Sequence, residues 1–136
     1  MKLSTKGRYG LMAMHRLSIN YGKGPISISE IAREENLSEA YLEQLFTLLK
    51  KNDLVKSLRG AKGGYQLKKA PEETKIGEIL NALEGNIAIS CKNLSSSDCR
   101  GIKACEGNSC ATKNILDTLQ EKLDNVLDSL TLADME

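Results

Sequence analysis

The stretch SISEIAREENLSEAYLEQLFTLLKKN, residues 27–52, predicts two short helices joined by a tight turn. Ser27 and Glu30 fit a capping box, in which the serine hydroxyl accepts from a free amide and the glutamate reaches back toward the serine. The first helix is therefore expected over residues 28–35. Asn36 is the turn residue, because asparagine tolerates the left-handed backbone that a tight helix-to-helix turn requires.

A second helix is predicted over residues 39–52, with Ser38 as its cap. Its apolar residues repeat with helical period and are Leu42, Leu45, Phe46 and Leu49. A small residue at a helix crossing, a turn residue and two apolar anchors have helix-turn-helix spacing; they are Ala32, Asn36, Leu42 and Leu45. The second helix can therefore enter a major groove, although a helical hairpin with a polar face would give the same pattern.

The start of this second helix carries polar side chains suited to DNA. They are Ser38, Tyr41, Glu43 and Gln44. Gln44 can bond to an adenine edge and Glu43 can accept from a cytosine amino group, whereas the other two can reach bases or phosphates. Lys50 and Lys51 suit phosphates.

A basic hairpin is predicted directly after the second helix. Residues 54–58 and 65–68 form the expected strands, and the glycine-rich residues 59–64 join them. Glycines let a backbone lie close to a duplex, while Arg59 and Lys62 supply charge for a narrow minor groove. This hairpin is the wing of a mainly α winged helix-turn-helix fold, with a plain flexible hairpin as the alternative.

Length and composition are those of one globular domain, with 136 residues of which 40% are hydrophobic and 27% charged. No run approaches the roughly 18 apolar residues of a membrane span, and residues 1–6 contain no apolar signal region. We therefore expect a cytoplasmic protein without a membrane partner. Because that compartment is reducing, clustered cysteines there indicate metal ligands or redox thiols before structural disulfides.

The net charge of +1 conceals two oppositely charged halves. Residues 1–75 contain 14 Lys and Arg against 8 Asp and Glu, whereas residues 76–136 contain 5 against 10. The basic half can neutralise phosphates and gain from counterion release, and the acidic half is better suited to pairing or sensing. Simple solvated faces are the alternative explanation of this asymmetry.

The second half predicts a linker helix capped by Thr74 and, after the cysteines, a long helix with an apolar seam. The seam residues are spaced 3, 4, 3 and 4 apart and are Leu116, Leu119, Leu123, Val126 and Leu130. Two copies of the chain could bury this stripe in a homodimer, which we favour over a helix packed on its own winged region. Four regions are therefore expected along the chain. A winged helix-turn-helix region covers residues 1–70 and includes a first helix over 5–20. It is followed by a linker helix region over 71–90, a cysteine-rich cluster-binding loop over 91–111, and a dimerisation helix with its tail over 112–136.

A loop with glycine, serine and asparagine holds the four cysteines, which are Cys91, Cys99, Cys105 and Cys110. Four thiolates within 20 residues suit iron–sulfur ligation, because backbone amides of such a loop can bond to sulfur and tune the potential. Structural zinc sites usually use C-x2-C pairs, and the intervals here, seven, five and four intervening residues, contain none. A cluster is therefore favoured over a thiol or disulfide switch, and both over zinc.

The chain contains three specific segments in order. They are Leu3-Ser4-Thr5-Lys6-Gly7-Arg8-Tyr9, Tyr41-Leu42-Glu43-Gln44-Leu45-Phe46, and Leu58-Arg59-Gly60 with Gly63-Gly64-Tyr65. Together with the order of elements, they resemble the bacterial IscR/NsrR-type transcription regulators of the Rrf family over nearly all 136 residues. The resemblance implies a homodimer that binds an imperfect palindrome in double-stranded DNA.

The resemblance also implies a role for each matching residue. Those facing bases would be Ser38, Glu43 and Gln44. Those in the minor groove would be Arg59 and Gly60. Those on the DNA backbone would be Ser4, Thr5, Lys6, Arg8 and Tyr41.

The cysteine loop departs from the family pattern at one position. IscR-like members hold a [2Fe–2S] cluster with three loop cysteines and a histidine three residues after the last, and Lys113 stands in the place of that histidine. Lysine is a poor ligand because its amine is protonated near neutral pH. Cys91 takes the first position and Cys110 the last, so the other two share the middle and all four are candidate ligands of a cluster expected to be [2Fe–2S]. NsrR-like members use an acidic residue near the N-terminus of the partner subunit, and Arg8 at that position argues against this route.

The leading hypothesis is a DNA-binding regulator that senses iron–sulfur or redox status. The alternative is a cluster-free member of the same family that is controlled by thiol oxidation or by a bound metabolic enzyme, as in the cysteine-metabolism regulators. An enzyme such as a small redox protein has little support, because the sequence contains no C-x-x-C pair, no Ser/His/Asp set and no phosphate-binding loop.

Overall fold

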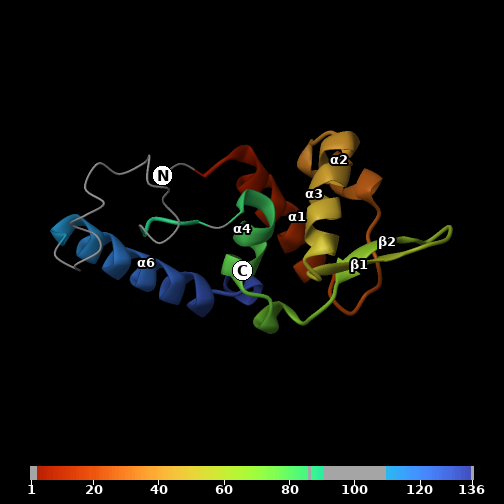
Figure 1. Ribbon diagram of the computed structural model, residues 1–136. Coiled ribbons are helices and arrows are strands. Elements are labelled where there is room, and N and C mark those ends of the chain that lie inside the picture. The colour runs from red at the N-terminus through yellow and green to blue at the C-terminus, as the bar shows by residue number, and fades with distance from the viewer. Residues whose placement is uncertain (1–2, 86, 91–109, 136) are drawn as a thin grey trace.

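A computed structural model describes residues 3–85, 87–90 and 110–135 of the chain (Figure 1). The elements in chain order are α1 (Thr5–Ile19), α2 (Ile28–Glu35), α3 (Glu39–Lys51), β1 (Val55–Leu58), β2 (Gly64–Leu67), η1 (Pro71–Glu73), α4 (Ile76–Glu84), α6 (Ala111–Ser129) and η3 (Leu132–Met135). The hairpin of β1 and β2 and the long helix α6 extend from opposite sides of the helices α1–α4 (Figure 1). The mainly helical class with a small β wing is confirmed.

Capping serines begin both helices of the helix-turn-helix, as predicted. The Ser27 hydroxyl accepts from the Glu30 amide at 3.2 Å at the start of α2. Asn36 lies in the left-handed region, with φ 55° and ψ 49°, and turns the chain toward α3. The Ser38 hydroxyl accepts from the Tyr41 amide at 3.2 Å. Each cap satisfies an amide that the helix itself cannot pair, so the local sequence determines where both helices begin.

The core forms around one face of α3. Its buried residues are Leu42, Leu45, Phe46 and Leu49. They belong to one cluster with Met14 and Leu17 of α1 and Ile31 of α2. Leu132 of η3, in the segment expected as a tail, is also fully buried in this cluster. Burial of such side chains contributes roughly 1.5–3 kcal/mol each, so the end of the described chain helps to hold the winged region together.

The wing is an antiparallel pair in which Val55 lies opposite Leu67. Its base is tied to the residues before α2, because Ile26 and Tyr65 exchange backbone hydrogen bonds of 2.9 and 2.8 Å. The Tyr65 ring also stacks on Phe46 of α3, with centroids 4.6 Å apart. The wing therefore has a defined orientation relative to α3.

Two glycines allow α4 to pack closely on α1. A Cβ atom at Gly10 would lie 2.0 Å from Leu83 Cδ1, and one at Gly7 would lie 2.8 Å from Glu84 Oε1. Both positions are buried on one face of α1, three residues apart. The end of α4 thus lies directly against the first turns of α1.

The start of α4 differs from the sequence prediction. Lys75, rather than Thr74, is the cap residue, and its side chain makes no capping hydrogen bond. The Thr74 hydroxyl is buried and donates instead to the carbonyl of Ala70 at 3.0 Å, closing the short helix η1. A buried hydroxyl needs a partner, and the carbonyl four residues earlier is the nearer one in this turn.

The helix α6 joins the winged region mainly at its C-terminal end. The Ile76 amide donates to the Leu130 carbonyl at 2.9 Å, and the Leu132 amide donates to the Thr74 carbonyl at 3.0 Å. Near the same end, Gly77 leaves room for Leu127, because a Cβ atom added at Gly77 would lie 2.9 Å from the Leu127 Cβ atom. No residue of α6 is buried. Most of its apolar seam is therefore not covered by the described part of its own chain.

Gly64 offers a test of the wing base. Its φ of 153° is strained for other residues, and an added Cβ would lie 2.2 Å from the Ile26 carbonyl oxygen. Gly64→Ala should therefore lower the free energy of unfolding by roughly 2–5 kcal/mol, because backbone strain and steric overlap add. Gly60→Ala is the matched control, since Gly60 has φ 120° and open space around it. In chemical denaturation, Gly60→Ala should lower the free energy of unfolding by only about 1–3 kcal/mol, and by less than Gly64→Ala does. Equal losses of unfolding free energy for the two variants would contradict the close approach at Gly64.

Candidate nucleic-acid interface and cysteine loop

The face of α3 opposite the core is exposed and carries the predicted base-reading residues. Glu43 and Gln44 are both exposed near the N-terminal end of the helix. Lys50 and Lys51 are exposed at its C-terminal end, and the Lys50 ammonium donates to the Ser57 hydroxyl of β1 at 3.0 Å. The structure thus places exposed polar side chains near the N-terminal end of α3 and exposed cations at its C-terminal end.

Ser38 and Tyr41 have structural partners as well as exposed atoms. The Ser38 hydroxyl uses an acceptor lone pair on the α3 cap but can still donate. The Tyr41 hydroxyl donates to the Thr5 hydroxyl at 3.4 Å, and the Tyr41 ring meets the edge of Tyr9 with centroids 5.9 Å apart. These contacts join the start of α3 to the start of α1, a proximity that sequence spacing does not predict.

The predicted backbone-contacting residues lie together in the first turn of α1 and at its cap. Ser4, Thr5, Lys6 and Arg8 are all exposed there. The Ser4 hydroxyl donates to Glu84 Oε1, and the Gly7 amide donates to the same oxygen at 2.8 Å. The Ser4 hydroxyl, together with the Gly7 amide and the Lys6 charge, holds the pKa of Glu84 below its usual range. Glu84 is therefore negatively charged at neutral pH.

The tip of the wing is open and basic. Arg59, Gly60 and Lys62 are exposed, and the Gly63 amide closes the tip by donating to the Gly60 carbonyl at 3.0 Å. Figure 1 shows the tip extending well beyond the helices. Such a basic tip has the shape and charge to follow a DNA groove.

The structure describes only one of the four predicted metal ligands. Cys91, Cys99 and Cys105 lie outside the described residues. Cys110 is half-buried at the N-terminal cap of α6. One turn later, the Lys113 ammonium pairs with Asp117 at 2.9 Å. Among the residues that are described, no group of three or more His, Cys, Asp or Glu side chains is placed to hold a metal ion.

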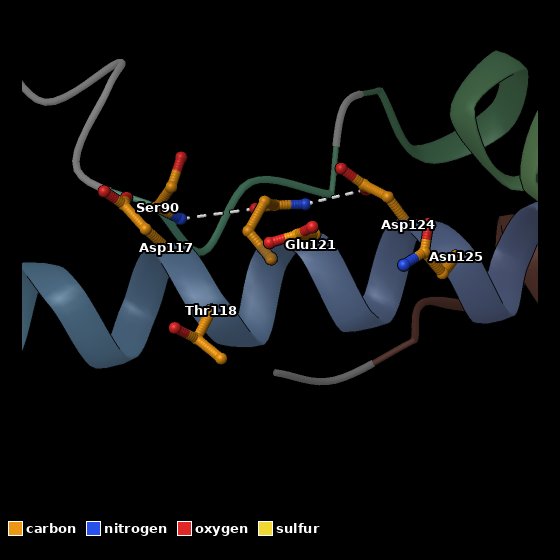
Figure 2. Close-up of a pocket in the computed structure, with 7 residues that line it drawn as sticks. Ser90, Asp117, Thr118, Glu121, Asp124 and Asn125 are labelled. Carbon is orange, nitrogen blue, oxygen red and sulfur yellow. Dashed lines mark hydrogen bonds between the residues drawn. The ribbon is translucent and has the colours of Figure 1, made fainter.

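A single side chain of α6 holds the segment that leads into the cysteine loop. Gln120 Oε1 accepts from the amides of Ile89 and Ser90 at 2.5 and 3.2 Å. Its Nε2 donates to the Ile87 carbonyl at 3.0 Å and to Asp124 at 2.9 Å. Figure 2 shows Ser90 lying against α6. The polar cavity that Ser90 lines there has a volume of about 420 Å³. The residues just before Cys91 are therefore fixed to the helix that begins just after Cys110.

Glu84 and Gln120 are the residues that the sequence pattern does not single out. Each contacts residues 30 to 80 positions away, so neither has a local spacing signal. Gly7 and Gly10 are the nearest clue, because two glycines three residues apart in a helix suggest the close approach of another element. The partner in that approach is decided only by the fold.

A helix-turn-helix followed by a basic wing defines a winged-helix DNA-binding protein. A family model described as an iron-dependent transcriptional regulator, Rrf2, matches residues 3–136. The chain belongs to the Rrf2 family of DNA-binding transcriptional regulators. Its relatives are regulators rather than enzymes. Within residues 3–85, 87–90 and 110–135, no helix combines the length and apolar character needed to cross a membrane.

The relatives include two kinds of regulator. CymR of Bacillus subtilis is 41% identical over 135 residues, covering 99% of this chain and 89% of that protein. Its structure, described as that of the global cysteine regulator, superposes with a TM-score of 0.72 and 43% identity, covering 99% of this chain and 95% of the other. IscR of Erwinia tasmaniensis is 34% identical over 136 residues, covering 99% and 78%. The structure of T. potens IscR has a TM-score of 0.73 and 42% identity, covering 99% and 85%. The chain is similar to both kinds over nearly its whole length.

Proposed function

We propose that this regulator reads its DNA site with the start of α3 and grips the backbone on either side. The observation that supports this most is the division of α3, whose one face is fully buried while Glu43 and Gln44 are exposed on the other. Ser38 completes the base-facing set, and Arg59 with Gly60 of the wing enters the minor groove. The phosphate contacts come from the start of α1, from Tyr41 and from the lysines at the end of α3; these residues are Ser4, Thr5, Lys6, Arg8, Tyr41, Lys50 and Lys51.

The protein acts as a homodimer on a palindromic operator. The seam of α6 leaves Leu119, Val126 and Leu130 46%, 54% and 43% exposed in the single chain. A helix with a continuous apolar stripe is stabilised when a second copy covers it. Two α3 helices would then read half-sites about one helical turn apart. The seam thus sets the geometry of the operator.

The cysteine loop binds an iron–sulfur cluster, [2Fe–2S], through Cys91, Cys99, Cys105 and Cys110. The donor chemistry fits, because thiolates are the usual ligands of such clusters. The contact of Lys113 with Asp117 fits as well, since an ammonium in an ion pair has no lone pair for iron. When bound, the cluster supplies a redox-sensitive and oxygen-sensitive group. The chain's own contribution is the placement of Cys110 on α6 and the attachment of residues 87–90 to the same helix through Gln120.

A cluster-free regulator controlled by thiol oxidation or cysteine metabolism is the second candidate. The observation that favours it is the similarity to CymR, which is as extensive as the similarity to IscR. In that case the same loop would respond through its thiols. The two candidates share the DNA-binding surface and differ only in what occupies the loop.

The base-reading role is tested by Gln44→Ala with Arg59→Ala as its comparison. A duplex selected by the wild-type protein from a randomised library serves as the operator. Gln44→Ala should lose roughly 1–3 kcal/mol on this duplex and little on random DNA, because a base contact discriminates between sequences. Arg59→Ala should weaken binding to both and reduce the magnitude of the salt slope by about one. Equal losses for Gln44→Ala on both DNAs would remove it from the base-reading set.

The dimer is tested at the exposed seam of α6. Leu119→Asp places a carboxylate between two apolar stripes, so sedimentation should show monomers. Operator affinity should fall by roughly 100-fold or more with the loss of bivalent binding. Asn125→Asp adds the same charge on an exposed position of α6 away from the seam and should remain dimeric. A wild-type monomer at micromolar concentration would refute the dimer.

The cofactor is tested by anaerobic reconstitution with ferrous iron and sulfide. A four-cysteine site should give a coloured protein, and each single Cys→Ser change should reduce iron loading, because each thiolate is one ligand. Lys113→His should have little effect on a complete thiolate set. A colourless protein that still binds the selected operator would favour the cluster-free candidate. Iron loading that survives removal of all four cysteines would exclude the proposed ligands.

A further inference from the structure

The helix α1 begins without a cap from its own sequence. Ser4 is its cap residue, yet the Ser4 side chain makes no capping hydrogen bond to the helix. The first turn also contains no acidic residue to interact with the helix dipole. A serine in this position usually accepts from the amide two or three residues later, as Ser27 and Ser38 do in this chain. The start of α1 therefore depends on another group.

Glu84, at the end of α4, supplies the missing cap. Its Oε1 accepts from the Gly7 amide at 2.8 Å, which is the amide that a capping serine would take. The same oxygen accepts from the Ser4 hydroxyl, so the cap residue itself is also held. Gly7 permits this approach, because a Cβ there would lie 2.8 Å from Oε1. A carboxylate at this end of a helix also complements the helix dipole.

The position of Glu84 is costly for a DNA-binding surface. A carboxylate beside the cations of α1 opposes phosphate binding and reduces the counterion release that they provide. Its effect on the geometry of α1 can offset that cost. The first turn of α1 also reaches α3, because the Tyr41 hydroxyl donates to Thr5. The orientation of this turn thus affects two groups of proposed DNA contacts.

We propose that Glu84 is a positioning residue for DNA binding, which caps α1 from α4 and so aims Lys6 and Arg8 at the DNA backbone. The proposal rests on the DNA contacts proposed above for the start of α1. Glu84 touches no DNA itself. Since Glu84 closes the helix that precedes residues 87–90, it also connects the DNA-facing end of α1 to the segment that Gln120 attaches to α6.

The sign of one mutational effect tests this role. Electrostatics alone predicts that removing a carboxylate tightens DNA binding, whereas loss of the cap predicts weaker binding. Glu84→Ala should bind a random-sequence duplex roughly three- to thirtyfold more weakly, the range expected for loss of a helix cap. The magnitude of its salt slope, measured between about 50 and 200 mM KCl, should fall by about one to two, because Lys6 and Arg8 no longer reach phosphates. Glu84→Gln keeps an acceptor without the charge and should lie between Glu84→Ala and the wild type.

Glu39→Gln is the charge-matched control, since Glu39 is exposed in the first turn of α3. It should bind as tightly as the wild type or more tightly. A mere loss of folded protein would weaken binding but leave the salt slope unchanged, so the slope separates positioning from stability. If Glu84→Ala is too unstable to be measured, the salt slope of Glu84→Gln is compared with that of the wild type instead. An unchanged slope then refutes the positioning role.

Two further variants separate this proposal from the proposed function. Lys6→Ala and Arg8→Ala should each lower the magnitude of the salt slope by about one. If they do and Glu84→Ala binds with an unchanged slope, the role of Glu84 is refuted and the DNA surface stands. If neither of them alters the slope, the placement of α1 on DNA fails, and the role of Glu84 fails with it.

Discussion

Helix α3 buries one whole face, and the elements around it are positioned by their packing against that face. Phe46 and Leu49 have no exposed surface, and helices α1 and α2 and the wing pack around this face of α3. Because the helix can present only one face to the core, its opposite face must meet solvent or DNA. The same packing directs the wing, since Tyr65 stacks on Phe46. Core formation and the display of Gln44 are thus two consequences of one arrangement.

The start of α1, where DNA-backbone contacts are proposed, is built by a different interaction. Leu83 and Glu84 of α4 approach the backbone of α1 where glycines replace larger side chains. The apolar residue packs and the acidic residue accepts from the helix start, so one short helix both positions and caps another. In the chain, α4 is followed by residues 87–90, which lie just before the first cysteine of the loop.

The loop itself is bounded by groups on a single helix. Gln120 attaches the residues before Cys91, and Cys110 begins α6 after the loop. A loop whose sequence contains four thiols can serve an iron–sulfur cluster or thiol chemistry. The similarity to both IscR and CymR regulators extends over nearly the whole chain, so the fold is compatible with either kind of regulator. The shared fold by itself therefore does not decide which kind of regulator this chain is.

The helix-turn-helix, the wing and the apolar seam can all be predicted from local sequence, because caps, turns and helical periodicity are local properties of the chain. It also singled out Gln44 and Arg59, since an exposed polar position on an amphipathic helix and a basic residue at a glycine-rich turn can be recognised from spacing alone. Three contacts become visible in the folded chain alone: Glu84 caps α1, Gln120 holds the residues before Cys91, and Leu132 completes the core. Those contacts join residues far apart in the chain, and the physical reason is that a hydrogen bond or a buried contact depends on distance in space, which local pattern does not encode.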